Sequence, residues 1–354
     1  MDASKNRDQY GVAATLVCIA VTLALLYVLR SVVAPLFVAL LLMALVEGLV
    51  RWLAHTWPSG PRWALVVLAS IIIILVLGAC ALVLSFGASR LIAEAPTLSA
   101  RVTAILNDAG ALIGLSPAGV QEAFNVNAAM AAAQPMLATF GAFVAGVSLT
   151  MIFLAFMLAS RALLAQKVEI VAGTPEHAKR FKDILDRVAH SAGDYMRIQT
   201  IIGATLALLC GIAFAIIGLE NALFWAIIVF LCSYIPLVGG LIAGIAAALF
   251  ALAQFPTYWP ALAVLGTVIV ISALVGNLLL PKMQADKQNL DPTVSIFSVA
   301  LWSLLWGAAG ALLAVPLTVM LMIVFNQFDQ TRWVAVLISN DGIPEGERRR
   351  ATPG

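Results

Sequence analysis

A run of 61 consecutive residues, positions 221–281, contains no Asp, Glu, Lys or Arg. A soluble domain does not bury that much chain without a charge, whereas the hydrocarbon core of a bilayer excludes charged side chains. A membrane-spanning helix needs about 20 apolar residues, so this run is long enough for two passes. The sequence therefore predicts a protein that crosses a membrane several times.

The same run is interrupted at residues 234–240 by the sequence Tyr-Ile-Pro-Leu-Val-Gly-Gly. A Pro/Gly break at membrane depth leaves backbone N–H and C=O groups without helical partners, and lipid cannot satisfy them. Such a break must be buried in protein or line a water-filled cavity. We therefore expect the function to reside at this broken helix.

Composition supports a membrane protein along the whole chain. Hydrophobic residues make up 62% of it and charged residues 11%, against about 25% charged residues in soluble domains. We predict an all-α polytopic bundle of about eight membrane segments, with broken or re-entrant helices in the C-terminal half. The predicted segments are residues 9–29, 35–53, 63–89, 140–160, 198–219, 222–252, 259–280 and 292–328.

Basic residues predict the orientation, because cytoplasmic loops are enriched in Lys and Arg. Residues 90–139, the segment of about 50 residues before the fourth predicted span, contain only two basic residues, Arg90 and Arg101. The segment that follows residue 160 carries Arg161, Lys167, Lys179, Arg180, Lys182, Arg187 and Arg197. This second segment is predicted to be cytoplasmic and the first extracytoplasmic. Eight crossings then place both termini in the cytoplasm, although a re-entrant hairpin in the sixth or eighth segment would change that count.

We predict four regions. They are a three-span bundle (1–89), an extracytoplasmic amphipathic helical segment (90–139), a transport core (140–328) and a cytoplasmic polar tail (329–354). Within the core, residues 175–197 read as a cytoplasmic amphipathic helix that starts at Thr174-Pro175-Glu176, an N-cap followed by proline and an acidic residue. The two amphipathic segments are interpreted as packing collars, with a mobile gate or a contact within a homo-oligomer as the alternative.

Enzyme signatures such as HExxH, GxSxG and the P-loop are absent, so we predict that the chain is not an enzyme. The four cysteines lie in apolar runs without CxxC spacing, and the three histidines are far apart. These patterns predict neither a metal nor a cofactor. A net charge of +2 is too small to indicate a nucleic-acid partner. The expected partners are the lipid bilayer and a small molecule or ion.

A second break lies in the last apolar block, where residues 306–316 contain Gly307, Gly310 and Pro316. Interrupted helices in corresponding positions are a sequence sign of a transporter site, because their ends present dipoles at the bilayer midplane. The alternative is that these Gly and Pro residues only serve helix packing. The candidate pathway residues are Ser233, Tyr234, Pro236, Gly239, Gly240, Asn277, Pro281, Gly307, Gly310 and Pro316.

Glu47 is an acidic residue inside the second predicted span. An ionisable group within a span is a candidate for proton or ion coupling. Glu47 also lies four residues before Arg51, so an ion pair at the membrane interface is an equally good interpretation.

Three stretches resemble the autoinducer-2 exporter family of bacterial permease-like proteins. Residues 195–199 resemble its Tyr-x-Arg-x-Gln motif. Residues 218–223 and 235–240 resemble its Gly-Leu-x-x-Ala and Ile-Pro-x-x-Gly-Pro stretch. Residues 277–282, 290–292 and 307–316 resemble its C-terminal signature. The resemblance extends over residues 10–328, mainly through hydropathy in the N-terminal half. It implies transport across a bacterial inner membrane, because some members are similar to signal exporters and others to sodium/proton antiporters.

Four positions depart from the family pattern. Gly240 stands where proline is usual, and Leu280 stands where Glu or Gln often precedes Pro281. Residues 47–48 are Glu-Gly instead of Asn-Pro, and Asp291 replaces a frequent His. The absence of a polar residue at position 280 bears on the choice of substrate.

The sequence thus predicts a secondary transporter, a permease or exporter of a small polar solute, that works by alternating access. A sodium/proton-type antiporter is the first alternative, and it requires a titratable group such as Glu47 in the pathway. A membrane scaffold that transports nothing is the second, and a channel is the third.

Overall fold

The structure is a computed structural model that describes residues 17–112, 114, 116, 119, 146–160, 167, 170–171, 173–235, 238–279 and 289–343. These ranges are helical apart from turns and one isolated antiparallel bridge between Leu290 and Ser339. The helices long and apolar enough to cross a membrane are Arg30–Thr56, Arg62–Ala93, Pro175–Ile217, Trp259–Leu278 and Pro292–Phe325. Shorter apolar helices are Val17–Val28, Gly146–Ser160, Ala222–Cys232 and Gly239–Gln254. The prediction of an all-α polytopic bundle is confirmed.

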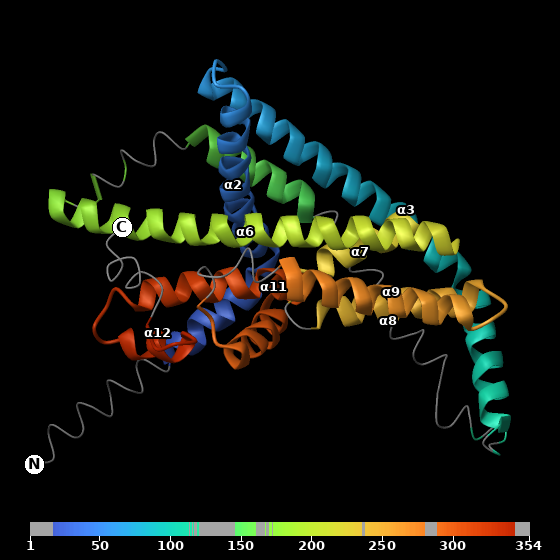
Figure 1. The fold of residues 1–354 in the computed structure, drawn as a ribbon. Coiled ribbons are helices and arrows are strands. Elements are labelled where there is room, and N and C mark those ends of the chain that lie inside the picture. The colour runs from blue at the N-terminus through green and yellow to red at the C-terminus, as the bar shows by residue number, and fades with distance from the viewer. Residues whose placement is uncertain are drawn as a thin grey trace, which may run out of the picture.

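Helix α6 (Pro175–Ile217) is the central element, and α2, α7, α9 and α11 all contact it (Figure 1). It begins as predicted, with Pro175 at N1 and the Thr174 hydroxyl accepting from the backbone N–H of His177. It ends at Gly218, whose φ of 85° is the left-handed conformation common after a helix. The predicted amphipathic helix and fifth span are therefore one continuous helix of 43 residues.

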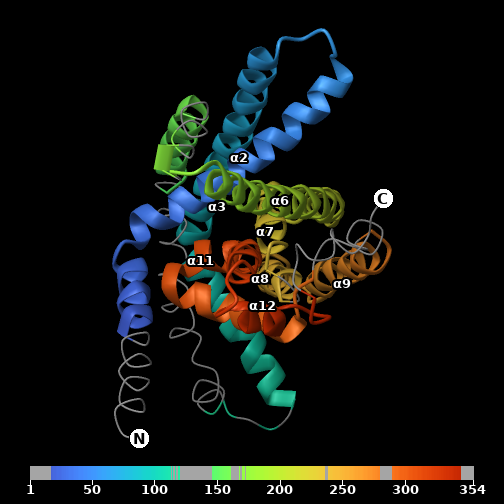
Figure 2. The ribbon, with the colours of Figure 1, turned by 90° about the vertical axis from the view of Figure 1, so that its left-hand side faces the viewer.

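The first two predicted spans follow one another without a loop that reverses the chain. The helix Val17–Val28 leads into α2 (Arg30–Thr56) through Leu29, where the hydrogen bonds from Leu29 N–H to the Leu25 carbonyl and from Val33 N–H to the Leu29 carbonyl continue the helical ladder. The sequence offers no Gly or Pro at this junction, so nothing there stops the helix. After a short turn, α3 (Arg62–Leu112) runs back past α2 and on beyond α8 (Figures 1 and 2).

The predicted sixth span is a helical hairpin. Helix α7 (Ala222–Cys232) packs along α8 (Gly239–Gln254), and the rings of Trp225 and Phe250 lie 5.5 Å apart. In a single straight helix these two residues would be separated by about 37 Å, at 1.5 Å per residue. The α7 helix has 11 residues, about 16 Å, which is too short to cross a bilayer core of about 30 Å alone.

The last residue of α8 bonds the segment that connects α6 to α7, and so joins the two ends of the hairpin. The Gln254 side-chain amide donates to the Gly218 carbonyl at 2.8 Å, and its oxygen accepts from the Glu220 backbone N–H at 2.8 Å. Both ends of the hairpin therefore lie beside the C-terminus of α6.

Helix α9 (Trp259–Leu274) continues into η1 (Val275–Leu279), a single π-helical turn. Such turns break the regular i to i−4 pattern and occur frequently at functional sites. The turn includes Asn277 and packs against α6.

Helix α11 (Pro292–Phe325) is also folded back on itself, because Gly307 has φ 63° and ψ −140° in its middle. The Trp302 indole N–H donates to the Thr318 hydroxyl at 3.2 Å, although 16 residues of continuous helix span about 24 Å. Helix α12 (Arg332–Ile338) then returns alongside α11. The predicted eighth segment is therefore a second hairpin.

Asp291 forms the N-cap of α11. Its carboxylate accepts hydrogen bonds from the backbone N–H groups of Val294 (3.2 Å) and Thr293 (2.8 Å). These bonds favour the ionised form and lower the pKa of Asp291 below its ordinary value. The residue that departs from the family pattern here is thus a helix cap.

Candidate functional site

The connection between α7 and α8 is held by a polar face of α6. Among the described residues, no backbone N–H pairs with the carbonyls of Ser233 and Tyr234. The Gln199 side-chain amide donates to the first at 2.5 Å, and the Tyr195 hydroxyl donates to the second at 3.4 Å. The Thr200 and Tyr234 hydroxyls share a further hydrogen bond of 2.8 Å. Because Gln199 is buried, these bonds replace the water that an exposed break would use.

The start of α8 requires small residues. A Cβ on Gly239 would collide with the backbone carbonyl of Cys232, so the chain can turn back on itself only without a side chain there. A Cβ on Gly240 would lie 3.1 Å from the Ser272 hydroxyl of α9. That hydroxyl is buried and has no hydrogen-bond partner among the described residues. Val238, the N-cap residue, gives α8 no side-chain cap.

The second break lies at Gly307, which is exposed. Its φ of 63° with ψ of −140° belongs to a region that residues with a side chain rarely adopt. A Cβ on Gly310 would collide with the Trp302 carbonyl, so the two halves of α11 approach each other closely. The Trp306 indole N–H donates to the Leu26 carbonyl at 3.1 Å, which fixes the tip of this hairpin to the N-terminal helix.

The two breaks converge on α6. Tyr195 belongs to the same apolar cluster as Trp302, Trp306 and Leu317 of α11, and Tyr234 packs against that cluster. Tyr195 thus bonds the first break through its hydroxyl and shares an apolar cluster with the second hairpin. Residues of the α7–α8 connection and of α11 therefore come together beside α6.

The remaining candidate residues have different surroundings. Asn277 is exposed and donates to the Ala273 carbonyl of its own helix at 2.8 Å. Pro316 is fully buried inside the second half of α11, nine residues after the break, so Gly307 rather than Pro316 marks the interruption. A buried proline is tolerated there because neighbouring helices can satisfy the freed carbonyl.

Pro236 and Pro281 lie outside the described residues. Glu47 is half-buried on α2 and takes part in an interaction there. Three residues earlier, Ala44 faces Gly193 of α6. The coupling role of Glu47 stays a prediction.

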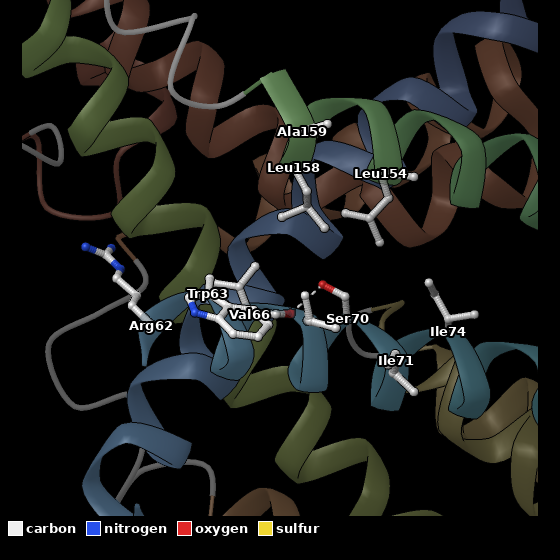
Figure 3. A pocket seen from close by; sticks show the side chains of 11 residues that line it. Arg62, Trp63, Val66, Ser70, Ile71, Ile74, Leu154, Leu158 and Ala159 are labelled. Carbon is white, nitrogen blue, oxygen red and sulfur yellow. Dashed lines mark hydrogen bonds between the residues drawn. The ribbon is translucent and has the colours of Figure 1, made fainter. Parts of the chain in front are cut away.

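A hollow lies elsewhere, between α3 and the helix Gly146–Ser160 (Figure 3). Its volume is about 790 Å³. Apart from Arg62 and Trp63, its walls are mostly aliphatic, and the Ser70 hydroxyl that faces it is already bonded to the Val66 carbonyl. It is lined by Arg62, Trp63, Val66, Val67, Ser70, Ile71, Ile74, Leu154, Ala155, Leu158 and Ala159. A solute site needs convergent polar groups, so this groove fits lipid chains rather than a polar solute.

Sequence reasoning did not single out the polar residues of α6 as site residues. Tyr195 and Gln199 entered through a motif resemblance, and Thr200 and Ser272 did not enter at all. A signal was present for the first group, because Tyr195 and Gln199 are spaced i and i+4 at the start of an apolar run. Ser272 has no comparable signal, since single serines are common in membrane helices.

Comparison with known proteins fits this architecture. The family model described as "AI-2E family transporter" matches residues 16–330. A protein of Haemophilus influenzae named "Putative transport protein" is 28% identical over 348 residues, 95% of this chain and 97% of the relative. The Escherichia coli protein named "AI-2 transport protein TqsA" is 28% identical over 314 residues, 86% of this chain and 87% of the relative. A further relative from Mycobacterium tuberculosis is 29% identical over 324 residues, 85% of each chain.

The matched region contains every labelled helix up to the end of α11, including both hairpins and the face of α6 that holds them. The chain therefore belongs to the AI-2E transporter family.

Proposed function

We propose that this transporter moves a small polar solute across the bacterial inner membrane by alternating access, with the solute pathway at the α7–α8 connection. The observation that carries the proposal is the polar contact between α6 and the tip of this hairpin. Helix ends and hydroxyl groups at membrane depth are the groups that broken-helix transporters use to bind solutes. Here these groups come from Ser233, Tyr234, Ser272 and Thr200.

The two hairpins supply the moving parts. Each packs against α6 and each has a tip that depends on glycine, at Gly239 and Gly307. Rotation of one hairpin against α6 would open the space beside Tyr195 to one side of the membrane and then to the other. In the conformation described here, the rings of Trp302 and Trp306 lie 5.1 Å apart, and Tyr234 packs against the cluster to which they belong.

Polar contacts at the helix ends relate the two hairpins to the predicted orientation. Arg180, in the segment predicted to be cytoplasmic, donates to the Gln327 carbonyl just after α11 at 2.6 Å. Arg101, in the segment predicted to be extracytoplasmic, donates to the carbonyls of Ala253 and Gln254. The α7–α8 hairpin then opens to the outside and the α11 hairpin to the cytoplasm. This replaces two crossings by two re-entrant hairpins; the cytoplasmic N-terminus stays a prediction.

Flux measurements in proteoliposomes test the proposal. We would use AI-2 as the first solute probe, because it appears in the name of the Escherichia coli relative. A pH-sensitive dye in the same vesicles would report sodium/proton exchange. Saturable AI-2 uptake without proton movement supports the permease, whereas sodium-dependent proton movement alone favours the antiporter. No flux of any probe would favour the scaffold.

Two substitutions test whether the solute passes beside the start of α8. Gly239→Leu forces a side chain against the Cys232 carbonyl, and Gly240→Val narrows the space beside Ser272, so we expect each to abolish or strongly reduce flux. Gly266→Leu on α9 is the matched control, since nothing lies within 4 Å of its Cβ position. Protein amount and a single symmetric peak on gel filtration show whether each variant folds. Normal flux through a folded Gly240→Val protein would place the pathway elsewhere.

A further inference from the structure

The extramembrane end of α3 reaches the open end of the α7–α8 hairpin. Beyond Ala93, α3 continues to Leu112 and passes close to the end of α8 (Figure 1). From this extension, the Arg101 guanidinium donates through Nη1 to the Ala253 carbonyl at 2.7 Å and to the Gln254 carbonyl at 2.8 Å.

These two carbonyls are among those that α8 itself cannot pair. The last four carbonyls of a helix have no N–H group four residues ahead, and they carry the negative end of the helix dipole. An arginine is well suited to them, because it supplies several N–H donors and a positive charge in one side chain. Arg101 therefore acts as the C-terminal cap of a helix that is 152 residues away in the sequence.

Other hydrogen bonds also hold the open end of the α7–α8 hairpin in place. Gln254 bonds the Gly218 carbonyl and the Glu220 N–H, both at 2.8 Å. Arg90, which lies before the extension on α3, donates to the Asn221 side-chain oxygen at 3.5 Å. That distance is at the outer limit of a hydrogen bond, so Arg101 makes the stronger of these two polar connections between α3 and the hairpin opening, beside the apolar packing of Gly87 against Phe224.

We propose that Arg101 is a positioning residue for transport. It latches the extracytoplasmic end of the α7–α8 hairpin to α3 and so keeps the hairpin tip, with Ser233 and Tyr234, closed to the outside. The link to transport rests on the proposed function above. The latch itself is a statement about the hairpin and can be tested without any solute.

Cys232, the last residue of α7, is a natural reporter at the hairpin tip, where it is half-buried. The other cysteines would be replaced (Cys18→Ser, Cys80→Ala, Cys210→Ala). A membrane-impermeant cationic methanethiosulfonate reagent is then added to the outside of intact cells, and the rate of Cys232 modification is measured. For Arg101→Ala we expect a rate about tenfold above that of the parent, which corresponds to about 1.4 kcal/mol at 25 °C.

Two further variants separate the latch from a surface-charge effect. Arg101→Lys keeps the charge but not the forked donors, so its rate should lie between those of the parent and Arg101→Ala. Arg90→Ala removes the same charge from the same helix and should stay within twofold of the parent. Loss of a cation alone would reduce the repulsion of a cationic reagent, so it would speed labelling only modestly and about equally at both positions.

Parent-like labelling of Arg101→Ala would overturn the proposal, and so would equal acceleration in Arg90→Ala. If Arg101→Ala does not reach the membrane, Arg101→Lys is measured instead, and a rate equal to that of the parent would likewise overturn it. A protein that transports none of the probes but shows the labelling pattern would refute the proposed function and leave the latch standing.

Discussion

Gln199 offers the most direct test of how the first break is stabilised. Its side-chain amide donates to the Ser233 carbonyl at 2.5 Å, and the residue is 8% exposed. Gln199→Leu keeps a side chain of similar size and removes the donor. Among the described residues, the Ser233 carbonyl then has no other donor at this half-buried position.

The magnitude follows from the cost of an unpaired buried acceptor, about 1–3 kcal/mol. Tyr195→Phe removes a longer bond of 3.4 Å and should cost less, under about 1 kcal/mol. Thr205→Val is the control on the same helix. The Thr205 hydroxyl is exposed and bonds only the Ile201 carbonyl of α6 itself, so its loss should fall within about 0.5 kcal/mol.

The assay is thermal unfolding of the purified protein in detergent, followed by gel filtration or intrinsic fluorescence. One kcal/mol shifts the midpoint of a protein of moderate size by about 2–4 °C, so Gln199→Leu should unfold on the order of 5 °C below the parent. The expected order of loss is Gln199→Leu, then Tyr195→Phe, then Thr205→Val. A Gln199→Leu midpoint equal to that of Thr205→Val would refute the idea that α6 satisfies the broken backbone.

Three other predictions follow from the geometry. Gly307→Ala should lower the free energy of unfolding by about 1–3 kcal/mol, because alanine is strained at φ 63°. The control Gly266→Ala in α9 should be neutral or slightly stabilising. Equal effects of the two substitutions in thermal unfolding would show that Gly307 is not a hinge. Glu47→Gln should abolish proton exchange in proteoliposomes if the antiporter alternative holds, and unchanged exchange would remove Glu47 as the carrier. The cap at Asp291 has a lowered pKa, so its stabilisation is complete above the unfolded pKa of about 3.9 and is lost as pH falls through the lower folded value. The midpoint difference between the parent and Asp291→Ala should therefore be constant from pH 7 to pH 5 and close below pH 4; a difference that persists in acid would contradict this.

The sequence predicted the class of fold and the positions of both breaks because these depend on local features. Charge-free runs, and the Gly and Pro residues that interrupt them, are visible without any knowledge of tertiary contacts. The start of α6 at Thr174 was predictable for the same reason, since an N-cap is a property of three or four adjacent residues.

The sequence did not predict whether the chain continues straight or turns back after each break. Residues 222–252 are apolar throughout, and a straight kinked span would bury the same side chains as a hairpin. The choice is made by distant groups, such as Gln254 at Gly218 and Trp302 at Thr318. The continuity through Leu29 was missed because a single Arg30 looked like the boundary between two spans.

One further consequence lies in the length of α6. Its 43 residues form a straight rod in Figure 1, and Tyr195, where both hairpins meet it, lies 20 residues from the end at Pro175. That arm is about 30 Å long, so a tilt of about 5° around Tyr195 displaces the Pro175 end by about 2.6 Å. A partner or a change in the surrounding lipid that displaces the Pro175 end of α6 would therefore move the helix against which both hairpins pack.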